Sequence, residues 1–508
     1  MAPGGGRARI GPASQDAGDH DRLGELVPVP LPRALAASLA ALAAAAALVA
    51  PMPAPVASAA PRTCVATPFR SDAARHVWYR IPAVVRTAAG TLVAFAERRD
   101  SVAPSSDTGD TDVVVARSTD RGCTWSTPRA IAANGTDTVG NPAPVVDRTT
   151  GEILLLTVDR PRGGTSFHGL HLQRSGDDGR TFTPYAEAGK DLARLPGWAG
   201  GLTGPGHAVQ LASGRLVVPI GYERHGRKGA YAVLSDDHGA TWRLGFDAEG
   251  DDHRQEGTIA ELPDGRLWIS YHEQSPAVPV GTGRIAALSS DGGATLSTPF
   301  RRLGLPTVSV QAGSLALTGR HAGLLLVSSP GTPDPSVRRV MTIFTARTAV
   351  PGSSWTRYPV TLDDTPASYS DLVQVDGETV GILYETGRRS WHEGIAFRTV
   401  PVAALTAGRT TPSRATLRVP AHPRAGRPLV VTARAVVPGT TSPAGALTVR
   451  LTGEHGRRTQ VLRLVHGGGG KRVATFARVP RGRCTVEAVY SGSPRIRAAT
   501  ARATLRVR

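Results

Sequence analysis

Lysine, cysteine and methionine each occur only three times among the 508 residues of this chain. The 59 basic residues are therefore almost all arginine, and they exceed the 41 acidic residues by 18. The sequence also lacks a long amphipathic helical pattern, which argues against a coiled coil and against a solenoid of helical repeats. With 40% hydrophobic residues, 58 glycines and 40 prolines, the composition predicts packed cores joined by many turns, and it argues against a disordered chain. The length suggests about two to four domains.

The excess of positive charge is confined to the end of the chain. Residues 405–508 contain 19 arginines and one lysine against only Glu454 and Glu487, a net charge of +18, whereas residues 1–404 are neutral. This distribution excludes a uniformly basic nucleic-acid-binding protein. We therefore expect a neutral body with a basic appendage and no nucleic-acid partner.

An apolar, alanine-rich segment, residues 34–50, follows Arg33 and leads into several prolines. The small residues Ala57-Ser58-Ala59 then supply the pattern of a cleavage site, so residues 1–60 are predicted to be a secretory signal and leader. A membrane anchor is the weaker alternative, because a spanning helix needs roughly 20 apolar residues. We expect a secreted, extracellular protein without stable membrane insertion. The part before the apolar segment is long for a signal, which leaves the true start open.

The three cysteines are Cys64, Cys123 and Cys484. Export permits a disulfide, and Cys64 and Cys123 lie in the same neutral region, so they are the favoured pair, with Cys484 left over. Three buried free thiols remain the alternative, because the sequence does not fix connectivity.

An eight-residue pattern, Ser-x-Asp-x-Gly-x-Thr-aromatic, recurs in the neutral region. Copies begin at Ser118, Ser175 and Ser235, and a weaker copy begins at Ser289, so the spacings are 57, 60 and 54 residues. In such a pattern aspartate accepts backbone N–H bonds and glycine takes positive φ, which predicts a tight turn after a strand. We interpret these aspartates as turn formers and not as catalysts.

A second repeat alternates with the first. A glycine turn followed by an apolar strand begins six times, at Gly90, Gly151, Gly214, Gly265, Gly323 and Gly377. The gaps of 51 to 63 residues exceed the usual solenoid period of about 20–47 residues. Radial repetition of one sheet unit explains them, so residues 61–404 are predicted to form a six-bladed β-propeller.

Residues 405–508 lack these repeats and alternate apolar with polar positions in short runs. About 100 residues with this pattern predict a small immunoglobulin-like β-sandwich. The expected fold class is therefore all-β, with a propeller followed by a basic sandwich. The basic sandwich is expected either to bind anionic polymers or to act as a solvated spacer.

Three further segments carry a family resemblance: Arg80-Ile81-Pro82, the strand that ends in Glu97-Arg98-Arg99, and Tyr369-Ser370-Asp371-Leu372. Together with the repeated turns, they make residues 62–404 resemble the bacterial exo-sialidases, also called neuraminidases. The resemblance implies a secreted retaining exo-α-sialidase that removes terminal sialic acids from glycoproteins, glycolipids and oligosaccharides. It implies a covalent sialyl-tyrosine intermediate and no cofactor.

The resemblance implies three catalytic residues. Asp107 is expected to act as general acid and then as general base, Tyr369 as nucleophile, and Glu256 as the base that activates Tyr369. A neutral nucleophile suits this substrate, because the sugar's own carboxylate would repel a carboxylate nucleophile. Tyrosine has an ordinary pKa of about 10, so it needs a base to become nucleophilic near neutrality.

The resemblance also implies the substrate-binding side chains. Arg80 and Arg338 are expected to clamp the substrate carboxylate, because the planar guanidinium binds carboxylates bidentately. The neighbouring Arg339 is an alternative to Arg338. Arg99 is expected to face the 4-position of the sugar, and Glu385 to support Arg80.

One position departs from the family pattern. The second clamp arginine is expected 16 residues after Glu256, where this chain has His272. Histidine lacks the guanidinium fork and is charged mainly at acidic pH. The site therefore has a weaker clamp, or works at acidic pH, or recruits Arg254, or accepts a related acidic nonulosonic sugar. His272 as an ordinary pocket-wall histidine is a further interpretation.

Two functions from other classes compete with the hydrolase. One is a sialoglycan-binding, lectin-like propeller that has lost turnover through the change at His272, and the other is a non-enzymatic scaffold. The presence of Asp107, Glu256 and Tyr369 favours an enzyme, because a lectin needs neither an acid nor a nucleophile. The acidic run Asp251-Asp252-His253 is expected to be solvated, so no metal site is predicted.

Overall fold

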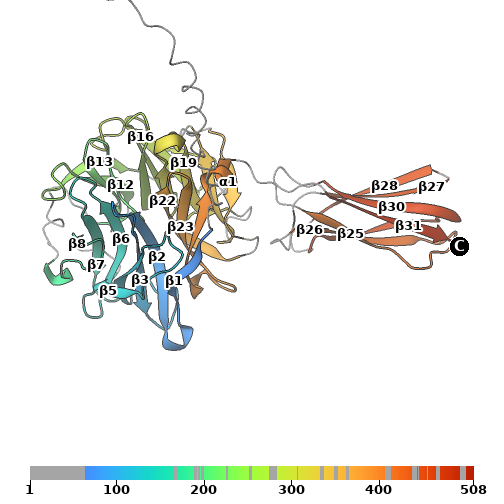
Figure 1. The fold of residues 1–508 in the computed structure, drawn as a ribbon, viewed down its shortest axis with the longest axis horizontal. Helices are drawn as coiled ribbons and strands as arrows, with labels where there is room; N and C mark the ends of the chain where they lie inside the picture. Colours follow the sequence, from blue (N-terminus) through green and yellow to red (C-terminus); the bar gives the residue numbers. More distant parts are fainter. Residues whose placement is uncertain are drawn as a thin grey trace, which may run out of the picture. The chain divides into compact units, whose positions relative to one another are not determined.

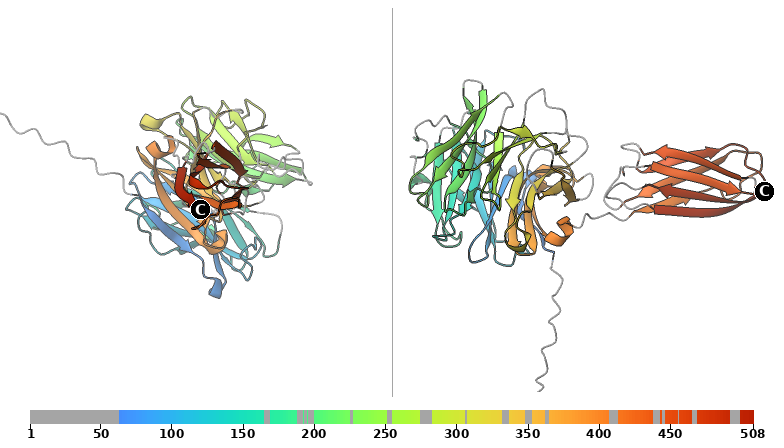
Figure 2. Two further views of the ribbon diagram at one scale, coloured as in Figure 1. Left: turned by 90° about the vertical axis from the view of Figure 1, so that its right-hand side faces the viewer. Right: turned by 90° about the horizontal axis from the view of Figure 1, so that it is seen from above.

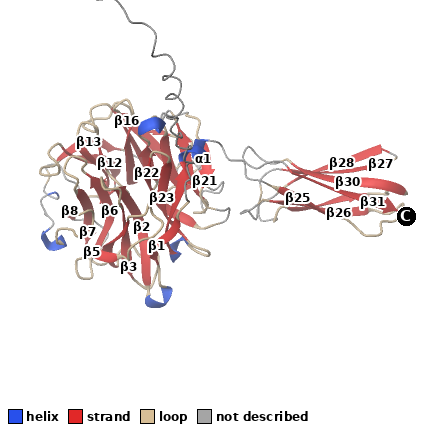
Figure 3. Ribbon diagram, viewed as in Figure 1, coloured by secondary structure: helices blue, strands red, loops and turns tan. Residues whose placement is uncertain are grey.

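The computed structural model describes residues 63–508 with internal gaps. The gaps are residues 165–168, 188–191, 193–194, 196–199, 225–226, 251–254, 274–282, 306, 332–336, 348–352, 362–364, 407–412, 438–442, 444–445, 455, 465–468 and 492–498. The predicted leader and its cleavage site, the run 251–253 and Arg254 lie outside the described residues. Strands dominate the described chain, and its helices are short turns (Figure 3). The prediction of an all-β protein is confirmed.

Residues 65–401 form antiparallel meanders. A seven-stranded sheet joins the first two meanders through one parallel pair, Thr111 with Thr138. Its strands are β2 (Val77–Arg86), β3 (Leu92–Asp100), β4 (Asp110–Ser118), β5 (Arg129–Ala132), β6 (Thr138–Val146), β7 (Ile153–Arg160) and β8 (Gly169–Ser175). The next sheet contains β9 (Leu202–Thr203), β10 (Val209–Gln210), β11 (Leu216–Arg224), β12 (Arg227–Ser235) and β13 (Arg243–Glu249).

Three four-stranded sheets follow. The first consists of β14 (Gln255–Glu261), β15 (Leu267–His272), β16 (Arg284–Ser289) and β17 (Arg301–Arg302). The second consists of β18 (Gly313–Ala316), β19 (Leu325–Pro330), β20 (Met341–Ala346) and β21 (Thr356–Pro359). The third consists of β22 (Ala367–Asp376), β23 (Thr379–Thr386), β24 (Gly394–Pro401) and, from the start of the described chain, β1 (Val65–Arg70). The helical turns of this part are η1 (Ala73–Arg75), η2 (Tyr185–Glu187), η4 (Gly319–His321), η5 (Trp391–Glu393) and α1 (Val402–Thr406).

The two ends of this set of strands are joined. β1 pairs antiparallel with β24, so blue and orange strands lie side by side in Figure 1. A disulfide links Cys64, just before β1, to Cys123, just after β4, and Cys484 is a buried free thiol, so the favoured cysteine pairing is confirmed. We call β2, β6, β10, β14, β18 and β22 the leading strands of the six meanders. Each leading strand contacts the next one: β2 contacts β6, β6 contacts β10, β10 contacts β14, β14 contacts β18, β18 contacts β22, and β22 contacts β2.

Six buried clusters hold neighbouring meanders together. Each cluster combines side chains from two consecutive meanders, because alternate residues of a strand point to opposite faces. In β3, for example, Leu92 and Ala94 pack towards β23 and β24, whereas Val93 and Phe95 pack towards β6 and β7. Strands buried on both faces explain the near-continuous apolar runs of the sequence.

The four repeated turns share one hydrogen-bond pattern. In the copy at Ser175, Thr181 donates to Asp177 through its backbone N–H (2.8 Å) and its hydroxyl (2.5 Å), and the Ser175 hydroxyl accepts from Gly179 N (3.0 Å). The same bonds recur at Asp120, Asp237 and Asp291. Burial opposes ionisation, but these hydrogen bonds lower the pKa of Asp177 to about 2. The interpretation of these aspartates as turn formers is confirmed.

Residues 414–507 form two antiparallel sheets that lie face to face (Figure 2). The sheets consist of β25 (Arg414–Arg418), β26 (Leu429–Val436) and β29 (Lys471–Phe476), and of β28 (Gly456–Arg463), β27 (Ala446–Gly453), β30 (Gly482–Tyr490) and β31 (Ala499–Val507). One hydrophobic cluster draws side chains from both sheets, including Val431, Val449 and Val486.

In the described part of the chain, no helix has the length and apolar character needed to cross a membrane.

Candidate active site

Backbone bulges lie where the candidate residues project. The leading strands of four meanders contain register shifts: β2 at Arg80–Ala83, β6 at Gly140–Ala143, β14 at Gln255–Gly257 and β22 at Ala367–Ser370, with a second shift in β22 at Gln374–Asp376. Three residues within these bulges, Ile81, Asn141 and Glu256, have positive φ values of 60°, 52° and 50°. A bulge redirects side chains out of the regular alternation and is frequent beside active sites. The bulges therefore aim Arg80, Glu256 and Tyr369 away from the regular strand faces.

Arg80 is buried and held by Glu385. Its Nε lies 2.6 Å from Glu385 Oε1, and both side chains are almost inaccessible to solvent. The same carboxylate accepts hydrogen bonds from Ile81 N (3.0 Å) and Tyr369 N (3.2 Å). Glu385 on β23 therefore fixes the Arg80 guanidinium and the backbone of Tyr369 together. The Arg80 guanidinium carbon lies 5.1 Å from the centre of the Tyr369 ring.

Tyr369 donates its hydroxyl to Glu256. The acceptor is Oε1 of Glu256, which reaches Tyr369 from β14, 113 residues earlier in the chain. Burial and the negative charge of Glu256 raise the pKa of Tyr369 well above its ordinary value, while Arg80 and Arg338 act in the opposite direction. The resting tyrosine is therefore a neutral phenol whose proton already points at a carboxylate.

Glu256 also contacts His272. His272 Nε2 on β15 lies 2.9 Å from Glu256 Oε2, and the imidazole is almost wholly buried. Burial opposes ionisation of Glu256, but His272 first, and then Tyr369 and Arg338, lower the pKa of Glu256 below its usual value. The two carboxylate oxygens are thus divided between the candidate nucleophile and the histidine.

A fully buried arginine, Arg284 on β16, stands beside His272 in the sheet register. Its hydrogen bonds go to neutral oxygens: Ser270 Oγ (3.2 Å), Ser270 O (3.2 Å) and Val310 O (3.1 Å). Burial lowers the pKa of Arg284 to about 9, against the charge of Glu256. Arg284 therefore adds positive potential behind Glu256 without contacting its carboxylate.

Arg99 and Asp107 form a second group. Arg99 Nε and Nη2 lie 2.8 and 2.6 Å from Glu97 Oε2, and its Nη1 lies 2.5 Å from Asp107 Oδ1. Arg99 and Glu97 are buried, whereas the Asp107 side chain is 66% exposed. Partial burial opposes ionisation of Asp107, but Arg99 and then Arg80 lower the pKa of this carboxyl. Asp107 is thus open to solvent and electrostatically coupled to Arg80.

Glu97 also explains a small residue in a neighbouring strand. Its Oε1 accepts a hydrogen bond from Asn141 N at 2.8 Å. A Cβ atom placed on Gly140 would lie 2.3 Å from the same Oε1. Only glycine at position 140 therefore leaves room for the carboxylate that orients Arg99.

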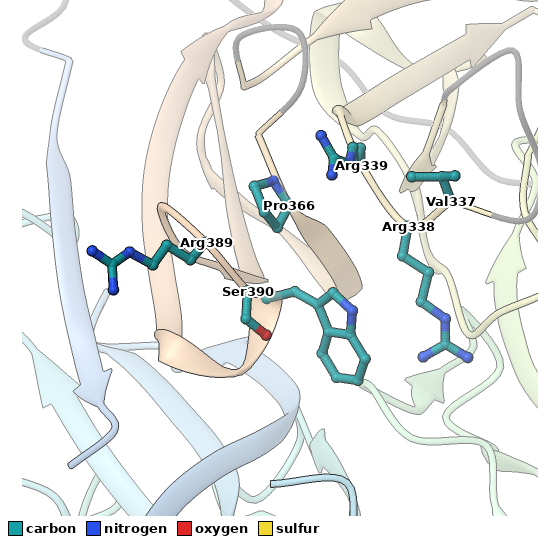
Figure 4. Close-up of a pocket in the computed structure, with 7 residues that line it drawn as sticks. Val337, Arg338, Arg339, Pro366, Arg389 and Ser390 are labelled. Atoms are coloured by element: carbon teal, nitrogen blue, oxygen red, sulfur yellow. The ribbon is translucent and has the colours of Figure 1, made fainter. Parts of the chain in front are cut away.

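The Trp391 ring lies beside two candidate substrate-binding arginines, Arg80 and Arg338. The Trp391 ring centre is 4.5 Å from the Arg80 guanidinium carbon and 5.3 Å from that of Arg338, and Arg338 Nη1 lies 3.2 Å from Ser368 Oγ. Trp391 and Arg338 border a pocket of about 410 Å³ that is also lined by Val337, Arg339, Pro366, Arg389 and Ser390. Figure 4 shows Arg338 and Arg389 extending in different directions from this pocket.

The structure brings most of the sequence-predicted residues into one connected site. A chain of close polar contacts links Arg80, Glu385, Tyr369, Glu256 and His272, and a separate ion pair joins Arg99 to Asp107. Arg338 acts electrostatically on Tyr369 and Glu256, whereas the neighbouring Arg339 is exposed, which favours Arg338 as the site arginine.

Sequence reasoning did not identify Glu97, Arg284 or Trp391. Glu97 lies two positions before Arg99 in the strand segment that carries the family resemblance. That proximity was a sequence signal for Glu97. Arg284 and Trp391 are joined to the site only by the pairing of strands and by the turn η5, and the sequence carries no local signal for them.

Comparisons with known proteins agree with this geometry. A family model described as the BNR repeat-like domain matches residues 90–382, more than half of the chain. The sialidase of Micromonospora viridifaciens is 28% identical over 377 residues, covering 65% of this chain and 55% of the relative. The exo-alpha-sialidase of Aspergillus fumigatus is 33% identical over 221 residues, covering 37% of this chain and 50% of the relative. The chain thus spans about half the length of these two relatives.

A third relative is covered more fully. The exo-alpha-sialidase of Arthroderma benhamiae is 28% identical over 350 residues, covering 62% of this chain and 79% of the relative. Among solved structures, a protein of unknown function from Dyadobacter fermentans matches with a TM-score of 0.52 and 18% identity. That match covers 67% of this chain and 99% of the solved chain, and it indicates a shared fold alone.

Proposed function

The chain belongs to the BNR repeat-like domain family, and from this we propose that it is a retaining exo-α-sialidase that hydrolyses terminal sialic acids from glycoconjugates. The hydrogen bond from the Tyr369 hydroxyl to Glu256 carries the proposal. A partly buried phenol bonded to a partly buried carboxylate is the arrangement that a tyrosine nucleophile and its base require. A lectin has no use for this pair, so the same observation favours an enzyme over the binding-protein alternative.

The proposed first step forms a sialyl-tyrosine intermediate. Tyr369 Oη attacks the anomeric carbon and passes its proton to Glu256, while the glycosidic C–O bond breaks and Asp107 donates a proton to the departing oxygen. Arg80 and Arg338 would hold the substrate carboxylate, and Arg99 would face the 4-position of the sugar. The open position of Asp107 next to buried Arg99 suits a group that must meet a leaving group from solvent.

The proposed second step restores the enzyme. Asp107, now a carboxylate, takes a proton from water as the water oxygen bonds to the anomeric carbon. The bond to Tyr369 breaks, and Glu256 returns its proton to the phenolate. Two displacements at one carbon retain its configuration.

Stereochemistry tests this proposal. Proton NMR during hydrolysis of a sialoside should show the α-anomer of the free sugar first, before it equilibrates. A β-anomer as the first product would exclude the tyrosine intermediate. Absence of hydrolysis across a panel of sialosides between acidic and neutral pH would favour the lectin-like alternative.

The architecture and location complete the proposal. The cycle of contacts between leading strands, together with the β1–β24 pairing, supports a closed six-bladed propeller over residues 61–404. The two facing sheets of residues 414–507 support an immunoglobulin-like sandwich in the predicted 405–508 domain. The Cys64–Cys123 disulfide supports a secreted protein with the leader 1–60, because disulfides persist in oxidising compartments.

Binding of anionic polymers by the basic sandwich is the last part of the proposal. Exposed arginines lie on both of its sheets, among them Arg418, Arg434, Arg483 and Arg506. Only Glu454 and Glu487 oppose them within residues 405–508, and Glu487 is already paired with Arg450 and Arg502. The surplus positive charge is thus available for mucin glycans or other polyanions.

A further inference from the structure

The two arginines proposed to hold the substrate carboxylate are supported in different ways. Arg80 Nε lies 2.6 Å from Glu385 Oε1, so a carboxylate fixes this guanidinium. Arg338 is hydrogen-bonded, among the described residues, to a neutral group: its Nη1 lies 3.2 Å from the hydroxyl oxygen of Ser368. Arg338 also lies outside the strands, just before β20, so its side chain needs another neighbour to define its direction.

The Trp391 ring is that neighbour. The guanidinium carbon of Arg338 lies over this ring, 5.3 Å from its centre, and that of Arg80 lies 4.5 Å from the same centre. The face of an aromatic ring carries partial negative charge and attracts a cation within about 6 Å, most strongly when the ring is tryptophan. One ring thus attracts both cations, whose like charges repel each other.

Trp391 is held by the hydrogen bonds of its own turn, η5. The Glu393 carboxylate accepts hydrogen bonds from the backbone N–H groups of residues 388–390 at 2.8–3.0 Å. The Ser390 hydroxyl accepts a hydrogen bond from His392 N at 3.3 Å, which completes a capping box. The turn therefore fixes where the ring begins, and it does so without a bound substrate.

The neighbouring His392 does not add a third cation at neutral pH. The centres of the Trp391 and His392 rings lie 3.5 Å apart. Burial first, and then the positive charge of Arg80, lower the pKa of His392 to about 4. The imidazole is therefore neutral at neutral pH, and the two arginines are the cations that face Trp391.

An aromatic ring suits this place better than a carboxylate would. A carboxylate paired with Arg338 would occupy the guanidinium fork and would repel the carboxylate of the substrate. A ring face attracts the guanidinium from one side and leaves the edge of its plane open to the substrate. Since His272 stands where the family pattern has a further clamp arginine, the clamp depends more strongly on the direction of Arg338.

We propose that Trp391 is a positioning residue that holds Arg338 for the substrate carboxylate, as Glu385 holds Arg80, but without bringing a negative charge into the site. The inference rests on the proposed function and deepens it, because it assigns part of carboxylate recognition to a neutral aromatic side chain. Trp391 acts through Arg338 and not on the reacting atoms.

Binding of two sugars measures the effect on the carboxylate alone. Ligand-observed NMR titration, which tolerates weak binding, should compare free sialic acid with its C1 carboxamide, which lacks the negative charge. Trp391→Leu keeps apolar bulk without a π face, so it should weaken binding of the acid about tenfold and binding of the amide less than about twofold. Trp391→Phe keeps a ring face and should weaken binding of the acid by only about threefold.

Trp125→Leu is the matched control. It removes a half-buried tryptophan from the first repeated turn, and it should leave both affinities unchanged. Equal weakening of acid and amide binding in Trp391→Leu, or equal losses of acid binding in Trp391→Leu and Trp391→Phe, would overturn the inference.

Fluorinated tryptophan tests the same point in the wild-type sequence, so the result does not depend on the folding of a variant. Fluorine withdraws electron density from the ring face and barely changes the size of the ring. Incorporation of mono-, di- and trifluorinated tryptophan should weaken binding of the acid stepwise. Binding of the amide should stay constant, which controls for the other tryptophans among the seven in the chain. Acid binding that does not change with the number of fluorine atoms would contradict the proposal.

A crystal structure separates this inference from the proposed function. In Trp391→Leu the Arg338 guanidinium should leave its place above residue 391, whereas Arg80, still held by Glu385, should stay. An unmoved Arg338 would refute the positioning role. If the wild type binds neither sugar and hydrolyses no sialoside, the proposed function fails, and this structure still decides whether Trp391 sets the direction of Arg338.

Discussion

Tyr369 and Asp107 need opposite surroundings for the two halves of the proposed reaction, and the residues around them differ accordingly. Tyr369 is partly buried and bonded to Glu256, and both its desolvation and this carboxylate raise the pKa of the phenol and keep its proton in place until attack. Asp107 is exposed and lies 2.5 Å from Arg99, which, with Arg80, lowers the pKa of the carboxyl despite its partial burial. The acid is therefore mostly ionised at neutral pH, and protonated Asp107 becomes more abundant as pH falls.

Replacement of Asp107 by alanine tests its assignment as the acid. A positioned general acid contributes about 10²–10⁴-fold, so turnover of natural sialosides should fall by about that factor. Substrates with acidic phenol leaving groups need little protonation and should lose less than tenfold. The comparison is made by kcat/KM on matched substrates, with Asp264→Ala, at an exposed turn aspartate, as the control. Equal losses on both substrate types would point to another acid.

The lowered pKa also predicts a pH profile. Activity on natural sialosides should rise as the medium becomes more acidic, because the protonated fraction of Asp107 grows towards its lowered pKa. The profile of an activated substrate should lack this rise, since its leaving group does not require the proton. Parallel pH profiles of kcat/KM for the two substrates measure the difference, and identical profiles would contradict it.

At the scale of the elements, the repeated turns directly follow β4, β8, β12 and β16, and the bulges interrupt the leading strands β2, β6, β14 and β22. The four Ser-x-Asp-x-Gly-x-Thr turns carry the same bonds, although the copy at Ser289 lacks the final aromatic residue. Asp371, within the motif quoted for Tyr369, accepts hydrogen bonds from Val84 N and His207 N at 2.9 Å each. This aspartate therefore joins β22 to β2 and to the segment before β10, which is a structural role.

Asp177→Ala should destabilise the protein by about 1–2 kcal/mol, because it removes hydrogen bonds worth about 0.5–1.5 kcal/mol each. The pKa of Asp177 is lowered to about 2 in the folded state, so its contribution is present above an unfolded value of about 4 and is lost as pH falls through about 2. Thermal unfolding at several pH values should show the wild type and the variant converging in that window. Asp177→Asn, which keeps one acceptor oxygen, should lose less stability and show no such convergence. A constant difference between wild type and Asp177→Ala down to pH 2 would contradict this account.

For the whole molecule, charge divides the chain into two parts with different chemistry. The body is neutral and the basic domain carries +18, so the proposed attraction to polyanions is assigned to the latter. The boundary predicted at residue 404 needs one adjustment for experiments. Leu405 in α1 is fully buried in the cluster formed with β20–β24, so a truncated body should end at Thr406.

Removal of residues 407–508 should leave kcat and KM for a small soluble sialoside unchanged. The full chain should bind sialylated mucin or an anionic cell-wall polymer at low salt and release it as salt rises, because screening shortens the Debye length to about 8 Å at physiological ionic strength. The truncated chain, assayed by cosedimentation in the same buffers, should not bind through this charge. If the full chain fails to bind either polymer at low ionic strength, the basic domain is a solvated spacer.

The sequence by itself determined the all-β class, the repeated turns and the position of the charge, because these depend on local periodicity and composition. Glycine and aspartate at fixed offsets define a turn wherever it stands, and alternating apolar residues define a strand before its partner is known. The family resemblance supplied the candidate residues Arg80, Asp107, Glu256 and Tyr369. It did so through short motifs that remain readable without coordinates.

Only the tertiary structure decided how those residues act on one another. Glu256 meets Tyr369 across 113 positions, and Arg80 meets Glu385 across 305. The contact between His272 and Glu256, the proposal of Arg338 over Arg339 and the positions of Glu97, Arg284 and Trp391 follow from strand register, bulges and burial. Electrostatic effects depend on distance and solvent exposure, and no spacing along the chain states either quantity.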